Sequence, residues 1–260
     1  MQWLWSRWPQ VEERIRKSRH TLLLLDFDGT LARIVPLPKQ VALPPSTKSA
    51  LRRLSRSSAV SVALISGRRL TELKRLVGLR NAIYIGNHGL EIMFKGVRMP
   101  VVVPRSSHEA LTRLRPRLAG FTADVPGARI EDKGISLSLH YRLVRGTSVA
   151  RLKAAFRGEV SPFVRSGVLT VLNGKRVLEV RPGVNWTKGH AALWLLKRMR
   201  RRSLLPIYIG DDRTDEDAFG MLKAGITIRV GFHSRSKAEF FVRGTMEVLS
   251  LLQWLAATYA

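Results

Sequence analysis

Short apolar runs separated by amphipathic segments make up the first part of the chain. The runs "TLLLLDF" at 21–27, "VSVALIS" at 60–66 and "AIYIG" at 82–86 each have the length of a buried strand. Helical patterns begin at about Ser46 and at about Leu70, between these runs. Continuous apolar strands that alternate with helices are typical of a parallel sheet covered on both faces. The pattern therefore predicts an α/β fold with a Rossmann-like, doubly wound parallel sheet.

The same pattern returns near the C-terminus. "LPIYIGDD" at 205–212 is an apolar run that ends in carboxylates, and "GITIRV" at 225–230 is a further predicted strand. Helices are expected from about Thr214 and from about Thr245. These two strand–helix units extend the predicted parallel sheet.

The segment between these two parts has a different pattern. It is predicted to hold a helix at 109–118, paired strands within "ARIEDKGISLSLHYR", a second helix, and the strands "LTVLN" and "RVLEVR". Helices combined with antiparallel hairpins indicate a separate α+β domain. We therefore assign 1–103 and 184–260 to a core domain and 104–183 to an inserted α+β domain.

The composition restricts the chemistry of this globular chain. The chain has 260 residues, of which 45% are hydrophobic, and it has no cysteine. Disulfides, thiolate metal sites and thiol nucleophiles are therefore excluded. No apolar run approaches the roughly 20 residues that span a bilayer, and the N-terminal "MQWLWSRWPQVEERIRK" lacks the features of a signal peptide. We expect a cytoplasmic protein without a transmembrane segment.

Positive charge dominates the composition. Lys and Arg number 45 against 19 Asp and Glu, which gives a formal net charge of +26. Such a balance attracts phosphate-bearing partners of any size, so a nucleic-acid binder is one hypothesis. Its candidate patch is "KRMRRR" at 197–202, but these residues also end a predicted helix, where cations complement the helix dipole. We favour this structural interpretation and expect no specific nucleic-acid partner, because no platform of stacked aromatic and basic residues is evident.

The N-terminal segment is rich in tryptophan. Trp3, Trp5 and Trp8 lie among basic residues, as in an amphipathic helix that rests on a membrane surface. Such a stripe more often packs on its own protein or on another subunit. We expect a monomer or a small homo-oligomer.

Polar side chains stand where the predicted strands end. Asp26, Ser66 and Asp211 occupy such positions, and Asp28 follows two residues after Asp26, with Gly29 permitting a sharp turn. Ligands of open α/β sheets bind outside the carboxyl ends of the strands, so these side chains are expected to converge. Clustered carboxylates repel one another, and a hard cation is the natural remedy.

The predicted cation is Mg²⁺. It takes oxygen ligands and commonly binds one or two carboxylates together with a substrate phosphate. "DDRTDED" at 211–217 resembles a calcium loop, but its sixth residue is Glu216, where an EF-hand needs glycine. A metal, two aspartates at one strand end, a hydroxyl and a lysine together indicate phosphoryl transfer.

Four motifs occur in the order found in a known superfamily. "DFDGT", "SGR", "KG" and "GDDRTDED" resemble the motifs of the haloacid-dehalogenase-like phosphatases. The resemblance implies that Asp26 is the nucleophile, and that Asp28 is the acid for the departing alcohol and later the base for water. It also implies that Thr30 helps to orient Asp28 and that Ser66 and Lys188 hold the phosphoryl oxygens. The implied ligands of Mg²⁺ are Asp26, the main-chain carbonyl of Asp28 and Asp211, with Asp212 and Asp215 in support.

A more specific resemblance extends from about Leu22 to the C-terminus. "IGNHGLEI", "IEDKGISLSLHYR", "LEVRPGVNWTKG" and "GDDRTDEDAF" look like segments of the trehalose-6-phosphate phosphatase family. In that family the inserted segment is a cap that closes over the core and excludes water. The resemblance implies contacts with the substrate from residues of the core, the cap and the hinge: Gly67, Arg68, His88, Glu131, Lys133, Arg142, Glu179, Arg181 and Asn185.

Plainer interpretations exist for several of these residues. His88 could fill a polar niche in the core, and Glu131, Lys133 and Arg142 could form an ordinary exposed pairing of charges on a strand. The resemblance nevertheless implies a Mg²⁺-dependent phosphatase that converts trehalose 6-phosphate to trehalose and phosphate. The alternatives are a related phosphatase for another sugar phosphate and a basic nucleic-acid-binding protein on the same fold.

Overall fold

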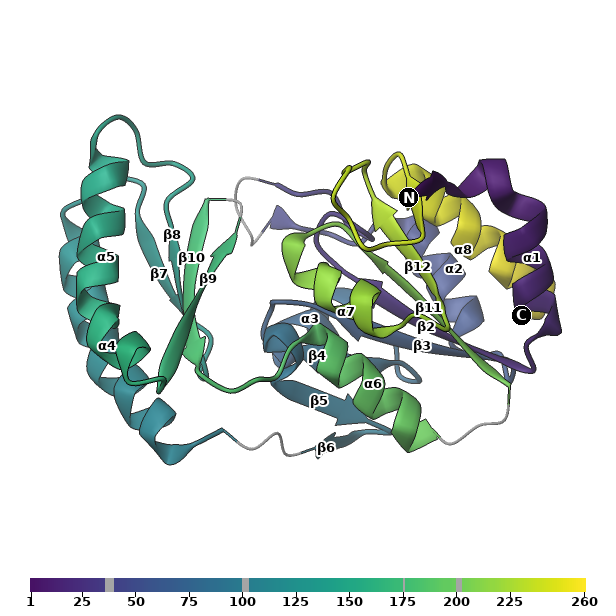
Figure 1. Cartoon of the computed structure of the whole chain (residues 1–260), viewed down its shortest axis with the longest axis horizontal. Coiled ribbons are helices and arrows are strands. Elements are labelled where there is room, and N and C mark those ends of the chain that lie inside the picture. Colours follow the sequence, from purple (N-terminus) through teal and green to yellow (C-terminus); the bar gives the residue numbers. More distant parts are fainter. Residues whose placement is uncertain (36–39, 100–102, 175, 200–202) are drawn as a thin grey trace. The chain divides into compact units, whose positions relative to one another are not determined.

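The chain folds into two compact units (Figure 1). The computed structural model describes residues 1–35, 40–99, 103–174, 176–199 and 203–260. The first unit comprises Met1–Pro100 and Trp186–Ala260, and the second comprises Val101–Asn185. A mostly parallel sheet lies in the first unit and an antiparallel sheet in the second, so the predicted α/β fold class is confirmed. The role of 104–183 as a cap for substrate recognition stays a prediction.

The parallel sheet is the centre of the first unit. Within the described residues its nine strands follow the order β1-β13-β12-β11-β2-β3-β4-β5-β6. Leu22, Leu23, Leu24 and Leu25 on strand β2 are all fully buried, because a strand covered on both faces has no polar side. The central parallel strands are β12 (Ile226–Val230), β11 (Leu204–Gly210), β2 (His20–Asp26), β3 (Val60–Ile65) and β4 (Ile83–Gly86).

The apolar pattern does not predict the strands at either edge of this sheet. On one side β13 (Phe240–Val242) and β1 (Gln2–Trp3) continue it in parallel. On the other side β5 (Glu91–Phe94) and β6 (Val97–Met99) are antiparallel. These strands have two to four residues, too few for a periodic pattern to stand out.

Helices cover both faces of the sheet. Leu23 and Leu25 belong to one large apolar cluster, so the alternate residues of β2 point to the opposite face. Figure 1 shows α6 and α7 on the near side of the sheet and α2 on the far side. The helices that contribute to the large cluster are α1 (Trp8–Lys17), α2 (Pro45–Leu54), α3 (Leu70–Val77) and α8 (Thr245–Tyr259). The others are α6 (Lys188–Met199) and α7 (Glu216–Met221), which follows a 3₁₀ turn at Arg213–Asp215.

The N-terminal tryptophans pack on their own chain. The ring centroids of Trp5 and Trp8 lie 4.8 Å apart, and Trp8 meets Trp254 of α8 edge to face at the same distance. Trp3 donates its indole N–H to Glu247 at 3.1 Å. These contacts favour the structural interpretation of the aromatic stripe.

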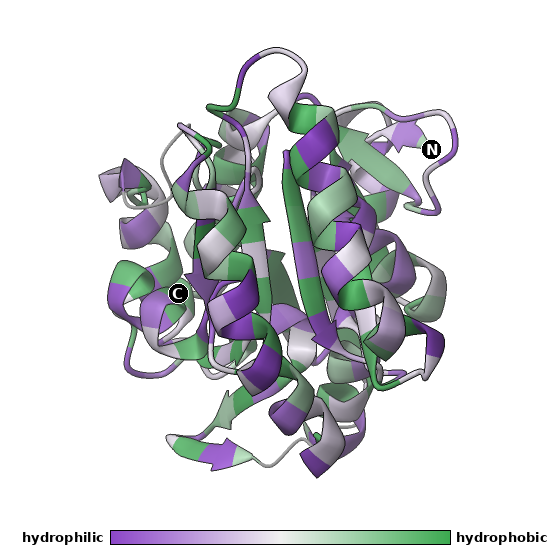
Figure 2. Ribbon diagram, turned by 90° about the vertical axis from the view of Figure 1, so that its left-hand side faces the viewer, coloured by the Kyte–Doolittle hydropathy of each residue, from purple (hydrophilic) through white to green (hydrophobic). Residues whose placement is uncertain are grey.

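The second unit combines four antiparallel strands with two helices. Among the described residues the strand order is β7-β8-β10-β9. One face carries Leu139 and Leu178, which pack with apolar residues of both helices into a separate core. In the ribbon coloured by hydropathy, green and purple residues alternate along the helices, as expected for elements with one buried side (Figure 2). The elements are α4 (Arg105–Ala123), β7 (Arg129–Asp132), β8 (Leu137–His140), α5 (Ser148–Arg165), β9 (Leu169–Gly174) and β10 (Val177–Pro182).

Candidate active site

Three neighbouring parallel strands end at one edge of the sheet and bring the predicted core residues together. β2 ends at Asp26, whose Cα lies opposite that of Ile65, the last residue of β3, and Ser66 follows directly. On the other side of β2, the parallel strand β11 ends one residue before Asp211. The convergence follows from the parallel register, because all three strands run toward the same edge.

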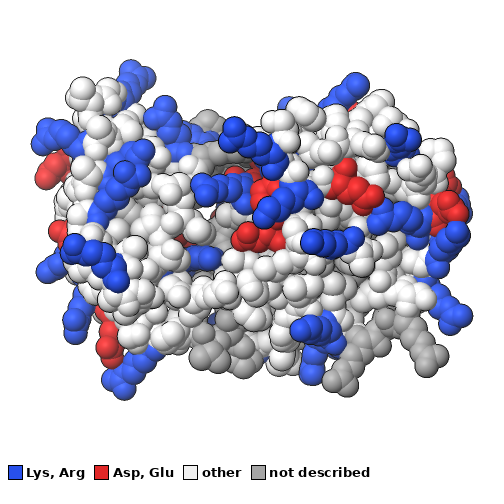
Figure 3. All heavy atoms as spheres, viewed as in Figure 1, with Lys and Arg blue, Asp and Glu red and all other residues white. Residues whose placement is uncertain are grey.

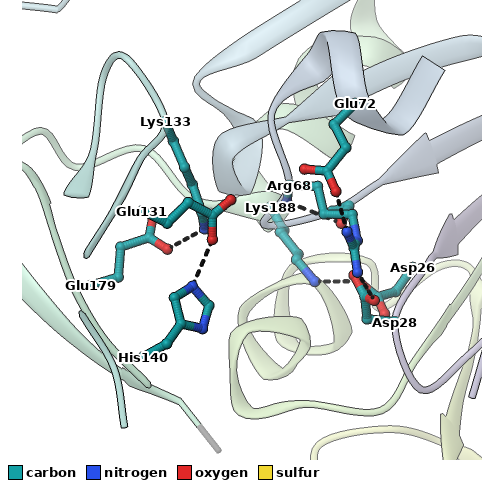
Figure 4. Close-up of polar contacts among 10 residues, drawn as sticks. Asp26, Asp28, Arg68, Glu72, Glu131, Lys133, His140, Glu179 and Lys188 are labelled. Carbon is teal, nitrogen blue, oxygen red and sulfur yellow. Dashed lines mark hydrogen bonds and ion pairs between the residues drawn. The ribbon is translucent and has the colours of Figure 1, made fainter. Parts of the chain in front are cut away.

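Asp26, Asp211 and Asp215 form a buried carboxylate cluster at this edge. One carboxylate oxygen from each residue lies within 4.8 Å of the other two. Lys188, the first residue of α6, donates from Nζ to Asp26 Oδ1 at 2.6 Å and to Asp215 Oδ1 at 2.8 Å. Figure 4 shows the lysine pointing toward Asp26. A residue 162 positions after Asp26 in the sequence thus meets the end of β2.

The described residues of this cluster include more acidic than basic groups. Asp26, Asp211 and Asp215 are buried carboxylates, and the ammonium of Lys188 pairs with Asp26 and Asp215. Burial raises the pKa of Asp26 well above its usual value, Asp215 and Asp211 raise it further, and Lys188 offsets only part of this. Burial would lower the pKa of Lys188, but Asp215 and Asp26 raise it above the ordinary value, so the lysine stays charged.

A divalent cation fits this donor set. The cluster supplies only carboxylate oxygen atoms, which suit a hard ion such as Mg²⁺. A cation there would relieve the repulsion that raises the pKa of Asp26. The buried aspartates are therefore consistent with a metal site, while the identity of the metal stays a prediction.

Three groups donate hydrogen bonds to the carboxylate of Asp215. Its Oδ1 accepts hydrogen bonds from Lys188 and from the Tyr208 hydroxyl, the latter at 2.7 Å. Burial raises the pKa of Tyr208, and Asp215 and Asp26 add to the rise, so this hydroxyl remains a donor. Asp215 Oδ2 accepts from the backbone N–H of Asp212 at 3.0 Å, while Asp212 Oδ1 accepts from the N–H of Arg213 at 2.6 Å. This capping arrangement fixes the loop after β11.

Asp28 is held by Arg68 rather than by Thr30. Arg68 donates from Nε to Asp28 Oδ2 and from Nη2 to Asp28 Oδ1, both at 2.7 Å. Its Nη1 bonds to Glu72, as Figure 4 shows. Thr30, expected to orient Asp28, is fully buried, and its Oγ1 has no hydrogen-bond partner among the described residues.

Ser66 and His88 lie in an irregular stretch beside this carboxylate cluster. The Ser66 hydroxyl accepts from the backbone N–H of Arg68 at 3.1 Å, and the Ser66 carbonyl accepts from the N–H of His88 at 3.0 Å. Asn87 and His88 both have positive φ angles, of 47° and 56°, which are uncommon for residues with a side chain. A Cβ added to Gly67 would lie 2.5 Å from the His88 ring, so the absence of a side chain lets the imidazole approach the Ser66 loop.

The second unit gathers polar residues on the face of its sheet opposite the helices. Glu131 on β7 pairs in register with Ser138 on β8, which pairs with Glu179 on β10. Glu179 Oε2 accepts from Lys133 Nζ at 2.6 Å and from the Ser138 hydroxyl at 2.9 Å. His140 Nε2 lies 2.6 Å from Glu131 Oε2. Strand alternation thus separates a polar face from the apolar face that meets α4 and α5.

Electrostatics favour the ionised form of Glu131 on this face. Burial would raise the pKa of Glu131, but His140, Lys133 and Arg129 outweigh it, so the pKa lies below its ordinary value. The Lys133–Glu179 pair is itself buried, which strengthens the attraction between the two charges.

The remaining predicted contacts differ in exposure. Arg181 is buried on β10 and shares the face of Glu179, two residues earlier. Arg142 is partly buried just after β8, and Asn185 is exposed in the segment that precedes α6. The substrate-binding roles of all three stay predictions.

Comparison with known proteins identifies the family. The profile of the trehalose-phosphatase family matches residues 24–246. The chain belongs to this family.

Individual similar proteins align with nearly the whole of this chain. An uncharacterized glycosyl hydrolase of Mycobacterium tuberculosis is 34% identical over 255 residues, which cover 94% of this chain and 19% of that protein. A probable trehalose-phosphate phosphatase of Oryza sativa is 30% identical over 271 residues, which cover 94% of this chain and 70% of that protein. The chain therefore spans about a fifth of the first relative and more than two thirds of the second.

A solved structure shares the fold. The C-terminal domain of trehalose-6-phosphate phosphatase from Candida albicans superposes with a TM-score of 0.81 at 23% identity, covering 96% of each chain. This similarity agrees with the core sheet and the antiparallel second unit described above.

The sequence patterns did not lead us to several residues of the site. Glu72 appears as an ordinary polar position of an amphipathic helix, and Tyr208 as one more residue of an apolar strand. Ser138 and His140 carried a usable signal, because "LSLH" alternates apolar and polar residues and places both on one face.

The predictions about nucleic-acid and membrane partners concern the charge and hydrophobicity of the chain. Figure 3 shows basic side chains spread across the visible face of both units, with acidic ones among them, in keeping with the net charge of +26. Part of "KRMRRR", namely 200–202, lies outside the described residues. No helix in the described part of the chain has the length and hydrophobicity to cross a bilayer.

Gly29 gives a direct test of the geometry. Its φ is 87°, and an added Cβ would lie 2.3 Å from Asp211 Oδ2. Gly29→Ala is expected to lower the free energy of unfolding by about 2 to 4 kcal/mol, because strain in the left-handed region adds to a clash with a buried carboxylate. Gly96→Ala is the matched control, since Gly96 has a φ of 79° but nothing within 4 Å of its added Cβ. The free energy of unfolding of this control, measured in urea, should fall by only about 1 to 2 kcal/mol. Equal losses would show that Asp211 moves aside freely.

Proposed function

We propose that this protein is a Mg²⁺-dependent phosphatase that hydrolyses trehalose 6-phosphate to trehalose and inorganic phosphate. The observation that carries the proposal is the buried cluster of Asp26, Asp211 and Asp215 around Lys188, at the carboxyl ends of the strands of a trehalose-phosphatase family member. A carboxylate, a lysine and a divalent cation suit a substrate whose reacting group is a dianion.

The first step is transfer of the phosphoryl group to Asp26. A carboxylate oxygen of Asp26 attacks phosphorus, the bond from phosphorus to the sugar oxygen breaks, and Asp28 donates a proton to that oxygen. Ser66 and Lys188 would bind the non-bridging oxygens. The position of Asp28 two residues after Asp26, outside the buried cluster and about one third exposed, supports its separate role as a proton carrier.

The second step releases phosphate. A water molecule attacks the phosphorus of the aspartyl phosphate, Asp28 accepts the proton of that water, and the Asp26 carboxylate is regenerated. The cation, held by Asp26, Asp211 and the Asp28 carbonyl with Asp212 and Asp215 in support, would neutralise negative charge on the phosphoryl oxygens. Lys188, which stays protonated because of Asp215 and Asp26, is suited to the same task.

The polar face of the second unit supports a sugar substrate. Glu131, Lys133 and Glu179 offer charged donors and acceptors in a fixed arrangement, with Ser138 and His140 as their partners. Such groups match the hydroxyls of a second glucose ring, and a site built to pair hydroxyls discriminates against ligands that lack them. A related phosphatase for another sugar phosphate is the alternative with the same chemistry.

A panel of sugar phosphates tests the substrate. Trehalose 6-phosphate should give the highest kcat/KM, with glucose 6-phosphate lower by on the order of 100-fold or more, because unmatched polar groups on the cap are costly. Glu131→Ala should reduce kcat/KM for trehalose 6-phosphate far more than for a small aryl phosphate, which needs only the core residues.

The same assay provides a control variant and the results that would contradict the substrate assignment. Glu109→Ala removes an exposed carboxylate of α4 and should leave both substrates unaffected. If Glu131→Ala harms both substrates equally, Glu131 acts through folding of the second unit. If another sugar phosphate is the best substrate, the assigned specificity is wrong while the phosphatase chemistry stands.

A further inference from the structure

Arg68 links two carboxylates that lie far apart in the sequence. Its side chain is 9% exposed, and its guanidinium lies 5.7 Å from the centroid of the Phe27 ring. On one side it binds both oxygens of Asp28, and on the other it binds Glu72. A planar guanidinium with a bidentate carboxylate fixes the tilt of that carboxylate as well as its position.

Glu72 is well placed to immobilise Arg68. It lies in the first turn of α3, where the helix dipole favours an acidic side chain. An arginine side chain has about 2 kcal/mol of rotamer entropy, and a second carboxylate at its far edge restricts that freedom. Burial lowers the pKa of Arg68, but Asp28 and Glu72 raise it above its usual value, so the guanidinium stays charged at any ordinary pH.

We propose that Glu72 is a positioning residue for the acid–base chemistry of Asp28, acting through Arg68. The inference rests on the proposed phosphatase function, because Asp28 has this role only if it moves protons. Asp28 is partly exposed in a loop after β2, and Thr30 makes no hydrogen bond to it. Among the described contacts, Arg68 is the side chain that orients the Asp28 carboxylate. Glu72 does not touch the reacting atoms and is not a catalytic residue.

The expected effect of Glu72→Gln depends on the leaving group. With trehalose 6-phosphate, whose alcohol needs an acid, kcat should fall about 10- to 100-fold with little change in KM, because misplacing a catalytic group by about 1 Å has effects of that size. An aryl phosphate with a good leaving group needs no acid in the first step. Its phenolate burst should therefore keep its rate within about twofold, while the steady-state rate falls because water attack still needs Asp28.

A double-mutant cycle distinguishes positioning from a general loss of structure. If Glu72 acts through Asp28, then Glu72→Gln should have almost no further effect on kcat when Asp28 is already asparagine. Glu12→Gln is the matched control, because Glu12 and Arg16 also form an ion pair four residues apart, on the exposed side of α1. It should leave the burst and the steady state unchanged.

Each outcome decides between the inference and the proposed function. A wild-type protein that hydrolyses no phosphate ester refutes the function, and with it the basis of the inference. Two results refute the inference alone when the wild type is active. In one, Glu72→Gln leaves kcat unaffected. In the other, Glu72→Gln lowers kcat equally in the wild type and in the Asp28→Asn variant. If Glu72→Gln does not fold, judged by its melting curve, Arg68→Lys takes its place in the same cycle, since lysine keeps the charge but loses the bidentate fork.

Discussion

Asp26→Asn is expected to have no measurable turnover of any phosphate ester and to form no phosphoenzyme. The amide lacks the charge and nucleophilicity of the carboxylate that Lys188 holds at 2.6 Å. Loss of a covalent nucleophile lowers kcat by factors on the order of 10⁴ to 10⁶ in well-studied hydrolases. Release of phosphate and acid-quenched labelling of the protein with a ³²P-phosphate ester measure the two quantities.

Asp28→Asn should fail in a different way. General acid–base catalysis contributes about 10²- to 10⁴-fold, so its loss is expected to leave a small residual rate. With an aryl phosphate whose leaving group needs no proton, this variant should accumulate labelled phosphoenzyme, because Asp26 still attacks but water is no longer activated. Labelling of Asp28→Asn without labelling of Asp26→Asn would separate the nucleophile from the proton carrier.

Stability measurements show whether the Asp26→Asn variant keeps its fold. Burial raises the pKa of Asp26, so the folded state favours the protonated carboxyl, and stability is lost as the pH rises through that raised pKa and the carboxylate ionises. In metal-free buffer at neutral pH, Asp26→Asn should therefore melt at no lower temperature than the wild type. Asp124→Asn, at an exposed position after α4, is the control and should keep full activity. Near-normal turnover by Asp26→Asn would exclude the covalent mechanism.

Removal of divalent cations by a chelator is expected to abolish turnover, and added Mg²⁺ should restore it. The reason is the buried cluster of three carboxylates, which opposes the approach of a phosphate dianion unless a cation is bound. Asp211→Ala should raise the Mg²⁺ concentration needed for half-maximal rate by at least about tenfold, because each lost ligand weakens an ion that prefers full oxygen coordination.

Thermal unfolding provides a measure of metal binding independent of activity. A ligand at 100 times its dissociation constant stabilises the folded state by about 2.7 kcal/mol. Mg²⁺ should therefore raise the melting temperature of the wild type, and the rise should be much smaller for Asp211→Ala than for Asp124→Asn. Undiminished hydrolysis after exhaustive removal of metal would contradict both the cofactor and the role of the cluster.

The sequence alone determined the layout of the core and the identity of its carboxylates. The runs that became β2, β3, β4, β11 and β12 are mostly apolar because both of their faces are covered, and that property is visible without any tertiary information. Asp26 and Asp211 could be placed at one edge because parallel strands end on the same side of a sheet. The motif order implied that Lys188, 162 residues away, belongs to the same site, but its contact with Asp26 is seen only in the structure.

Only the tertiary structure decided which side chains hold these groups. Glu72 and Asp28 are 44 positions apart, and no local pattern indicates that one guanidinium joins them. The register of β7, β8 and β10 places Glu131, Ser138 and Glu179 side by side. The sequence does not fix this register, because antiparallel pairing can be shifted by two residues without changing which face is polar. Local periodicity fixes the face on which a residue lies, whereas its partner depends on packing between segments that are remote in the chain.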